Sequence, residues 1–319
     1  MAKSNKDDTT ESRRSKGSSA ELQAVEHAFN EFADAAKHAV DEVNKRAGRD
    51  IFLAVFAAFV LLGVAAVCLI WLPWALVLVV TVAVCGAQIE MGKIFETRGV
   101  KILSIPLLTG SALFTLAVYA SALYPIIPVE VLLWIAGLTV VVVLVVRLSG
   151  PIDGYLADVA HSLFLFCYPC LLAAGMVLML AEDQGVAFVA SFLLIITAAD
   201  TGGYVMGLAI GKHPIAPRIS PKKSWEGLVG SLILASAAGL IMTIFLIGSS
   251  WWKGIIVGIV LAIVGFLGDL VESVIKRDLG IKDMGTLIPG HGGIMDRVDS
   301  YILTALPAWL IMIWLFPSV

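Results

Sequence analysis

Four polar side chains lie at helical spacing near the end of a long apolar run. Asp269, Glu272, Ser273 and Lys276 stand at positions i, i+3, i+4 and i+7, so on a helix they share one face. A carboxylate inside a membrane span is costly and usually functional, which also makes Asp200 a candidate. The plainer alternative is that these acids only end their helices among lipid headgroups. We expect the stripe to face into a helix bundle.

Two further aspartates, Asp296 and Asp299, are spaced to share a helix face just before the last apolar run. Two carboxylates are suitable ligands for Mg²⁺, which takes its remaining ligands from water and substrate phosphates. Helix N-capping would explain one of them. It does not explain the cations in the same stretch, a charge mixture that fits a polyphosphate site: Lys276, Arg277, Lys282 and Arg297.

A glycine-rich segment, 288–293, precedes these aspartates. It reads Ile-Pro-Gly-His-Gly-Gly, and its proline and glycines predict a structured turn and not a helix. Successive N–H groups of such a turn can converge on an anion, so we expect donors from Gly290, Gly292 and Gly293. His291 either fixes the turn or contacts substrate or metal.

A second polar segment covers residues 200–227. Gly203, Gly207 and Gly211 recur every fourth residue, a spacing that lets two membrane helices approach closely, within one chain or between two. The run 220–223 offers one hydroxyl and two ammonium groups that could hold phosphates. The bias of lysine towards cytoplasmic loops would also explain those lysines.

Long apolar runs must position these residues. Hydrophobic residues make up 59% of the chain and charged residues 15%, which predicts an all-α polytopic membrane protein. About nine runs are long enough for spans, namely 51–70, 73–89, 103–123, 129–147, 161–181, 186–200, 228–248, 254–272 and 301–317.

The distribution of basic residues predicts the threading. Lysine and arginine gather in the loops after the second, fourth, sixth and eighth runs, and such loops face the cytoplasm. We therefore expect a cytoplasmic N-terminus and a cytoplasmic site built from 200–227 and 272–300. Residues 1–20 are polar, lack the apolar core of a signal peptide and are expected to be disordered. Residues 21–48 predict an amphipathic helix, ahead of a transmembrane catalytic domain at 51–319. The net charge of −3 gives no support to nucleic-acid binding.

The spaced residues from Ser273 to Asp299 resemble the signature of the phosphatidate cytidylyltransferases, or CDP-diacylglycerol synthases. Its matching positions include Lys276, Asp283, Pro289 and Asp296. Segments 200–204 and 220–227 resemble the second patterned region of that family, with Ser224 where threonine is expected. The resemblance covers roughly residues 50–319.

This resemblance implies transfer of CMP from CTP to phosphatidic acid with Mg²⁺, giving CDP-diacylglycerol and pyrophosphate, the first committed step of phospholipid headgroup synthesis. It further implies a multi-pass protein of the plasma membrane, and a homodimer. Asp296 and Asp299 would hold Mg²⁺, and Asp269 and Asp283 a second cation such as K⁺. The groups expected to neutralise or contact the two substrates are Ser220, Lys222, Lys223, Ser224, Lys276, Arg277, Lys282, Gly290, His291, Gly292, Gly293 and Arg297.

Two other classes of protein share some of these features. A CTP-dependent polyprenol kinase or a CDP-alcohol phosphotransferase also needs spans and paired aspartates, but the spacing from Lys276 to Asp299 favours the cytidylyltransferase. A transporter also carries acids in its spans, usually near the bilayer midplane. Here the acids cluster with a loop at one face, and the sequence has no evident internal repeat.

Overall fold

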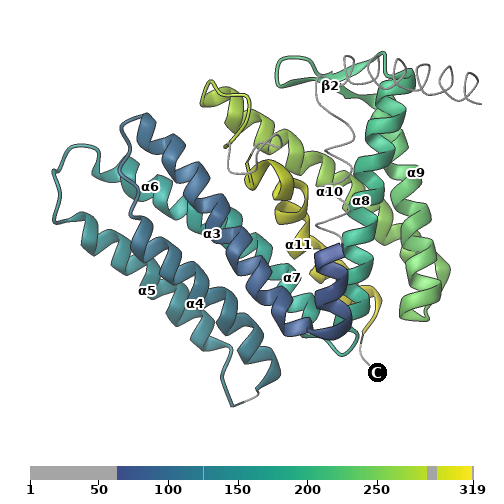
Figure 1. The fold of residues 1–319 in the computed structure, drawn as a ribbon, viewed down its shortest axis with the longest axis horizontal. Coiled ribbons are helices and arrows are strands. Elements are labelled where there is room, and N and C mark those ends of the chain that lie inside the picture. Colours follow the sequence, from purple (N-terminus) through teal and green to yellow (C-terminus); the bar gives the residue numbers. More distant parts are fainter. Residues whose placement is uncertain (1–62, 125, 286–292, 318–319) are drawn as a thin grey trace, which may run out of the picture. The chain divides into compact units, whose positions relative to one another are not determined.

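The computed structural model describes residues 63–124, 126–285 and 293–317. Within these ranges, eight helical segments are long and apolar enough to cross a membrane, which confirms an all-α polytopic membrane protein (Figure 1). They are α3 (Pro73–Thr97), α4 (Ser104–Leu123), α5 (Glu130–Arg147), α6 (Tyr155–Leu165) continued by η1 (Phe166–Leu171) and α7 (Leu172–Leu180), α8 (Gly185–Ile210), α9 (Trp225–Met242) continued by η2 (Thr243–Ile247), α10 (Trp251–Asp278) and α11 (Met295–Leu315).

The expected spans match these helices one by one from α3 onward. Most of the first expected span, 51–70, lies outside the described residues, and residues 63–71 are helical. The tail 1–20 and the expected amphipathic helix 21–48 also lie outside them. Helices α3, α8 and α10 continue past the expected ends at 89, 200 and 272, to Thr97, Ile210 and Asp278. Their last turns include polar residues, whose side chains can find partners within the bundle.

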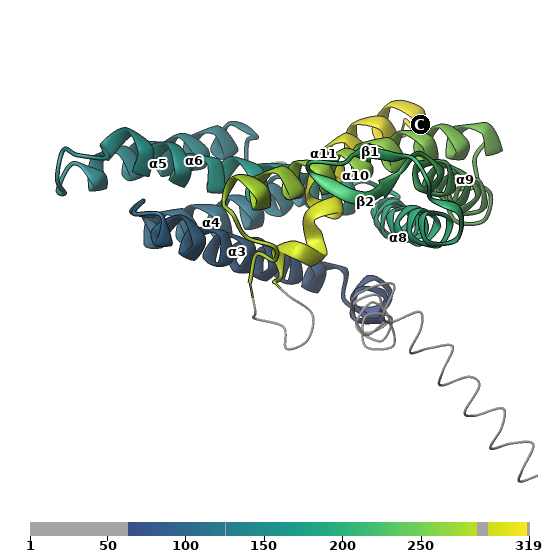
Figure 2. The same ribbon diagram turned by 90° about the horizontal axis from the view of Figure 1, so that it is seen from above.

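Helices α10 and α11 occupy the middle of the bundle. Helix α10 packs against α9 and α11, and α11 also packs against α7 and α3, so the pair lies between the α3–α7 group and α8–α9 in both views (Figures 1 and 2). A short antiparallel hairpin of β1 (Pro214–Ala216) and β2 (Ser220–Ser224) joins α8 to α9. The sequence interpretation did not anticipate this hairpin.

Small residues let α8, α9 and α10 approach closely. A Cβ on Gly202 of α8 would lie 2.3 Å from the Gly230 carbonyl oxygen of α9, and one on Gly258 of α10 would lie 2.4 Å from the Ala235 carbonyl oxygen. The predicted glycine repeat of α8 is part of this contact, because a Cβ on Gly203 would lie 2.5 Å from the Ser231 hydroxyl. These glycines therefore pack within one chain.

A π-helical turn at Pro169 shapes the helix that runs from α6 to α7. Proline has no N–H, so the Leu165 carbonyl, four residues earlier, loses its usual helical donor. Gln88 of α3 supplies a replacement, since its Nε2 donates to that carbonyl at 3.0 Å and to the Ser111 hydroxyl of α4 at 2.7 Å. One side chain thus joins three helices around the irregular turn.

The loops that were expected on one side meet at one end of the bundle. Arg98, after α3, donates to the Leu279 carbonyl after α10, and Arg277 of α10 donates to the Ile219 carbonyl of the hairpin at 3.2 Å. The N–H of Lys101, before α4, donates to Asp158 of α6 at 2.8 Å. The loops that follow α3, α8 and α10 therefore contact one another at one end of the bundle, as expected; the side of the membrane that they face stays a prediction.

A buried ion pair fastens α5 to α6 at this end. Arg147 Nε lies 2.6 Å from Asp158 Oδ2, with side-chain exposures of 3% and 4%. The other guanidinium nitrogens donate to the carbonyls of Pro151 at 2.7 Å and Asp153 at 3.1 Å. Both charges thus have partners, and removing either one would leave the other buried and unpaired.

We expect Asp158→Asn to destabilise the protein by about 3–5 kcal/mol, the usual result of breaking a buried pair from one side. Thermal unfolding in detergent micelles would measure the loss. Glu226→Gln is the control, because its partner His213 is 76% exposed and exposed pairs contribute little. Equal melting temperatures for the two variants would contradict the prediction.

Candidate active site

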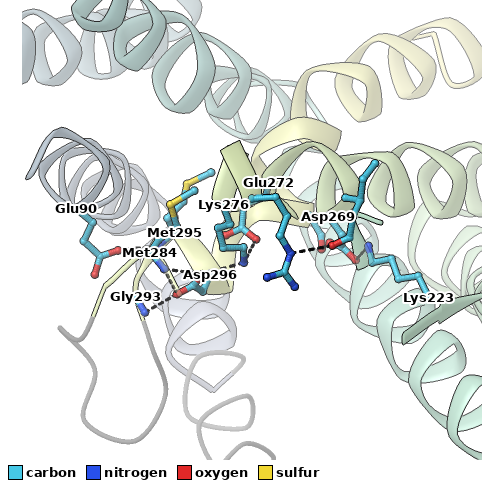
Figure 3. Close-up of polar contacts among 12 residues, drawn as sticks. Glu90, Lys223, Asp269, Glu272, Lys276, Met284, Gly293, Met295 and Asp296 are labelled. Carbon is cyan, nitrogen blue, oxygen red and sulfur yellow. Dashed lines mark hydrogen bonds and ion pairs between the residues drawn. The ribbon is translucent and has the colours of Figure 1, made fainter. Parts of the chain in front are cut away.

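The polar face of α10 points into the bundle, as expected from its spacing. Glu272 is 2% exposed, and Lys276, one turn further on, forms ion pairs with Glu272 and with Asp296 of α11, the latter at 3.0 Å. Asp269 accepts a hydrogen bond from the Ser300 hydroxyl of α11. The stripe therefore joins α10 to the start of α11 through charged groups (Figure 3).

The hairpin brings a lysine to the same stripe. Lys223, near the end of β2, lies 2.7 Å from Asp269 Oδ2, and its ammonium group also lies 4.8 Å from the centre of the Phe266 ring. Its neighbour Ser224 is buried, and its hydroxyl accepts the Gly227 N–H at 3.1 Å as the N-cap of α9. Capping fixes the junction between hairpin and helix, and this junction positions Lys223.

Asp296 accepts hydrogen bonds from the backbone on both sides of segment 286–292. Its Oδ2 accepts the Met284 N–H at 3.0 Å and the Gly293 N–H at 2.8 Å, while Lys276 contacts Oδ1. These donors converge on one carboxylate in Figure 3. The Gly293 N–H was expected to bind substrate phosphate. In this structure it donates a hydrogen bond to Asp296.

Asp299 of α11 and Asp200 of α8 add further carboxyl groups to the site. Asp299 lies near Asp200, Asp269 and Glu272, so carboxyl groups from α8, α10 and α11 gather in this site and oppose one another's ionisation. Lys223 and Lys276 offset part of the negative charge. A bound cation would offset more.

The described carboxyl groups could supply only part of a cation's ligands. In the part of the chain that the structure describes, no three side chains among Asp, Glu, His and Cys converge into a complete cation site. Mg²⁺ commonly uses only one or two protein carboxylates beside phosphate oxygens and water. The surplus of carboxylates around Asp296 and Asp299 fits that mode of binding.

Other predicted residues lie at the edge of this cluster or outside it. Lys282 and Asp283 are exposed, and in the described ranges they take no part in the ion pairs and hydrogen bonds that join Asp269, Lys276 and Asp296. Ser220 is half-buried and Lys222 is exposed, both on β2. Arg297 is half-buried on the first turn of α11, and Arg277 contacts the hairpin backbone. Gly290, His291 and Gly292 lie outside the described residues.

The sequence interpretation missed Glu90 of α3. This glutamate is 3% exposed, and its Oε2 accepts the Met295 N–H at 3.0 Å at the start of α11. The span was expected to end at 89, which placed Glu90 in a loop. The apolar pattern continues through Ile94 and Phe95, so the sequence could have predicted a helix that extends to Thr97. Glu90 would then have been an acid inside a membrane span, which marks a functional candidate.

Comparison with known proteins matches residues 53–316 to the cytidylyltransferase family. Phosphatidate cytidylyltransferase of Mycobacterium bovis is 37% identical over 293 residues, covering 88% of this chain and 94% of the relative. The protein of that name from Mycobacterium leprae is 37% identical over 283 residues, covering 84% and 89%. A Staphylococcus saprophyticus protein of the same name is 41% identical over 141 residues, covering 43% and 54%. By the extent of the family match and by identity along nearly the whole of two relatives, this chain belongs to the cytidylyltransferase family.

Proposed function

We propose that this chain transfers CMP from CTP to phosphatidic acid and produces CDP-diacylglycerol and pyrophosphate. One observation carries the proposal: Lys223, in the second patterned region, pairs with Asp269 of α10, and Lys276 of the same helix pairs with Asp296 of α11, so that residues far apart in sequence form one charged cluster. The relatives are named phosphatidate cytidylyltransferases, which supports phosphatidic acid as the acceptor and a cytidylyl group as the group transferred.

The reaction suits a site built of charges. A phosphate oxygen of phosphatidic acid forms a bond with the α-phosphorus of CTP, and the bond to the β-phosphate breaks as pyrophosphate leaves. Since the nucleophile is already an anion, the site needs no strong general base. It has to bring two polyanions together and stabilise the charge that spreads during transfer.

Two lysines that already pair with carboxylates can perform that task. Lys223 and Lys276 are 19% and 16% exposed at their side chains, so a phosphate that enters the cluster reaches ammonium groups partly shielded from water. Shielding strengthens the attraction between charges. We infer that these lysines exchange carboxylate contacts for phosphate contacts when the substrates bind.

Asp296 and Asp299 are the proposed ligands of Mg²⁺, which when bound would neutralise the phosphates of CTP. Asp269 is the proposed ligand of a second cation such as K⁺. Asp283, the other expected ligand, is exposed, and we assign it no direct contact. The surplus of carboxylates in the cluster supports these assignments.

We also propose that the site faces the cytoplasm from the plasma membrane. The basic residues of the loops gathered at this end of the bundle support that orientation. A homodimer is proposed from the family resemblance alone, because the α8 glycines that could have joined two chains pack against α9 of the same chain. Light scattering of the purified protein in detergent would measure the number of subunits.

The activity can be tested with purified protein in mixed micelles. Labelled CTP, phosphatidic acid and Mg²⁺ should yield CDP-diacylglycerol and pyrophosphate in equal amounts, and a chelator should stop the reaction. Release of pyrophosphate that does not depend on the lipid would contradict the proposal. Formation of CDP and a polyprenyl phosphate from a polyprenol would identify a kinase instead.

A further inference from the structure

A buried carboxylate from outside both signature segments holds the start of α11. Glu90 lies on α3, is 3% exposed, and accepts the N–H of Met295, the first residue of α11, at 3.0 Å. Figure 3 places it beside the backbone that leads into Asp296. Through its bond to the Met295 N–H, Glu90 of α3 thus contacts the residue next to Asp296, the proposed metal ligand.

Helix α11 has few other groups to satisfy its first turn. Its N-cap residue, Ile294, makes no side-chain capping bond, whereas the first N–H groups of any helix lack partners within the helix. A carboxylate at that end offers a hydrogen-bond acceptor and a favourable charge for the helix dipole. Glu90 therefore caps α11 from another helix.

Two glycines allow the backbone to lie against this carboxylate. A Cβ on Gly285 would fall 2.6 Å from Glu90 Oε1, and one on Gly293 would fall 2.5 Å from Glu90 Oε2. These residues stand on the two sides of segment 286–292, and the neighbouring N–H of Met284 donates to Asp296. Glu90 and Asp296 therefore bind the same stretches of backbone.

The second carboxylate oxygen of Glu90 accepts no hydrogen bond from the described residues. Its Oε1 is buried and has no hydrogen-bond partner among them. Unsatisfied buried groups are uncommon and call for an explanation, because a smaller apolar residue would pack without this cost. The acid is thus difficult to explain by packing alone.

We propose that Glu90 is a positioning residue of the site, which fixes the start of α11 and the flanks of segment 286–292 so that the Asp296 carboxylate is held in place. This inference rests on the proposed role of Asp296 in binding cation and substrate. Glu90 itself acts through the backbone and touches neither.

The first test replaces Glu90 and measures both cation dependence and backbone exchange. Glu90→Ala should raise the Mg²⁺ concentration for half-maximal activity by about 10- to 100-fold, as for residues that orient metal ligands. A purely structural defect would lower the active fraction and leave that concentration unchanged. Glu96→Ala is the control, since Glu96 is on the same helix but exposed.

Hydrogen exchange supplies a readout without metal or substrate. In full-length protein in nanodiscs, peptides covering 281–297 should exchange faster in Glu90→Ala than in wild type, because the acceptor of the Met295 N–H is gone. The same peptides should be unchanged in Glu96→Ala. Unchanged exchange and unchanged Mg²⁺ dependence in Glu90→Ala would overturn the inference.

A double-mutant cycle tests the contact itself. The three atoms nearest to a Cβ on Gly285 all belong to Glu90, so Gly285→Ala should also raise the Mg²⁺ concentration for half-maximal activity, mainly by displacing that side chain. Added to Glu90→Ala, it should then cause little further change. Full additivity of the two effects would overturn the inference.

Failure of this inference can be separated from failure of the proposed function. If Asp296→Asn is inactive but Glu90→Ala matches wild type, the positioning role is wrong and the function stands. If wild type makes no CDP-diacylglycerol, the function is wrong, and the exchange experiment still decides whether Glu90 holds the start of α11.

Discussion

Asp296→Asn is expected to lower the rate of CDP-diacylglycerol formation by about 10²- to 10³-fold, the usual effect of removing one strong electrostatic group from a reaction centre. Asp296 is the point where Lys276, the Met284 N–H and the Gly293 N–H converge. The amide removes the negative charge proposed to bind Mg²⁺ and turns an acceptor into a donor opposite an ammonium group. Initial rates at saturating CTP and lipid would measure the loss.

The loss should occur in a protein that is still folded. The amide keeps one oxygen that can accept the two backbone N–H groups, so the flanks of 286–292 retain an anchor. Thermal unfolding without ligands should stay close to that of wild type, and stabilisation by CTP with Mg²⁺ should disappear. Activity near the wild-type value would exclude Asp296 as a metal ligand.

The second large effect is expected for Asp269→Asn. Asp269 pairs with Lys223 at 2.7 Å and accepts from Ser300, so its charge holds the hairpin lysine over the site and lies near the other carboxylates. We expect a loss of about 10²-fold in kcat/KM. Kinetics with CTP and phosphatidic acid varied in turn would show which substrate is affected.

The double variant with Lys223→Met separates catalysis from structure. If the pair only supports the fold, removing both charges should restore much of the activity, because an unpaired charge causes most of the damage. If both groups act on substrate or cation, the double variant should stay as inactive as the worse single variant. Recovery of activity would contradict the proposed roles.

Much of the fold could be predicted because lipid imposes a simple rule on sequence. Every span must be apolar and helical, so the runs from 73 to 317 indicated α3 to α11 in order. Loop charges indicated which helix ends meet, and contacts such as Arg277 with Ile219 confirm this. The short hairpin escaped prediction because it is polar and rests on contacts with α8 and α9.

The site could be predicted in part for the same reason. Helical spacing on α10 placed Asp269, Glu272 and Lys276 on one face, and the structure confirms that this face is directed inward. The catalytic and metal-binding roles assigned to these residues stay predictions. Ser224 was expected among the substrate-contacting groups from the family resemblance, and the structure adds that its hydroxyl caps α9.

By itself, the sequence determined that the chain is a multi-span helical protein, which polar residues share a helix face, and which family signature it carries. These features depend on local periodicity and composition. Only the tertiary structure decided that Lys223 reaches Asp269, that Asp296 binds the backbone on both sides of 286–292, and that Glu90 accepts the N–H of Met295. The physical reason is that these contacts join residues far apart in the chain, and such pairings are set by how the helices pack in three dimensions.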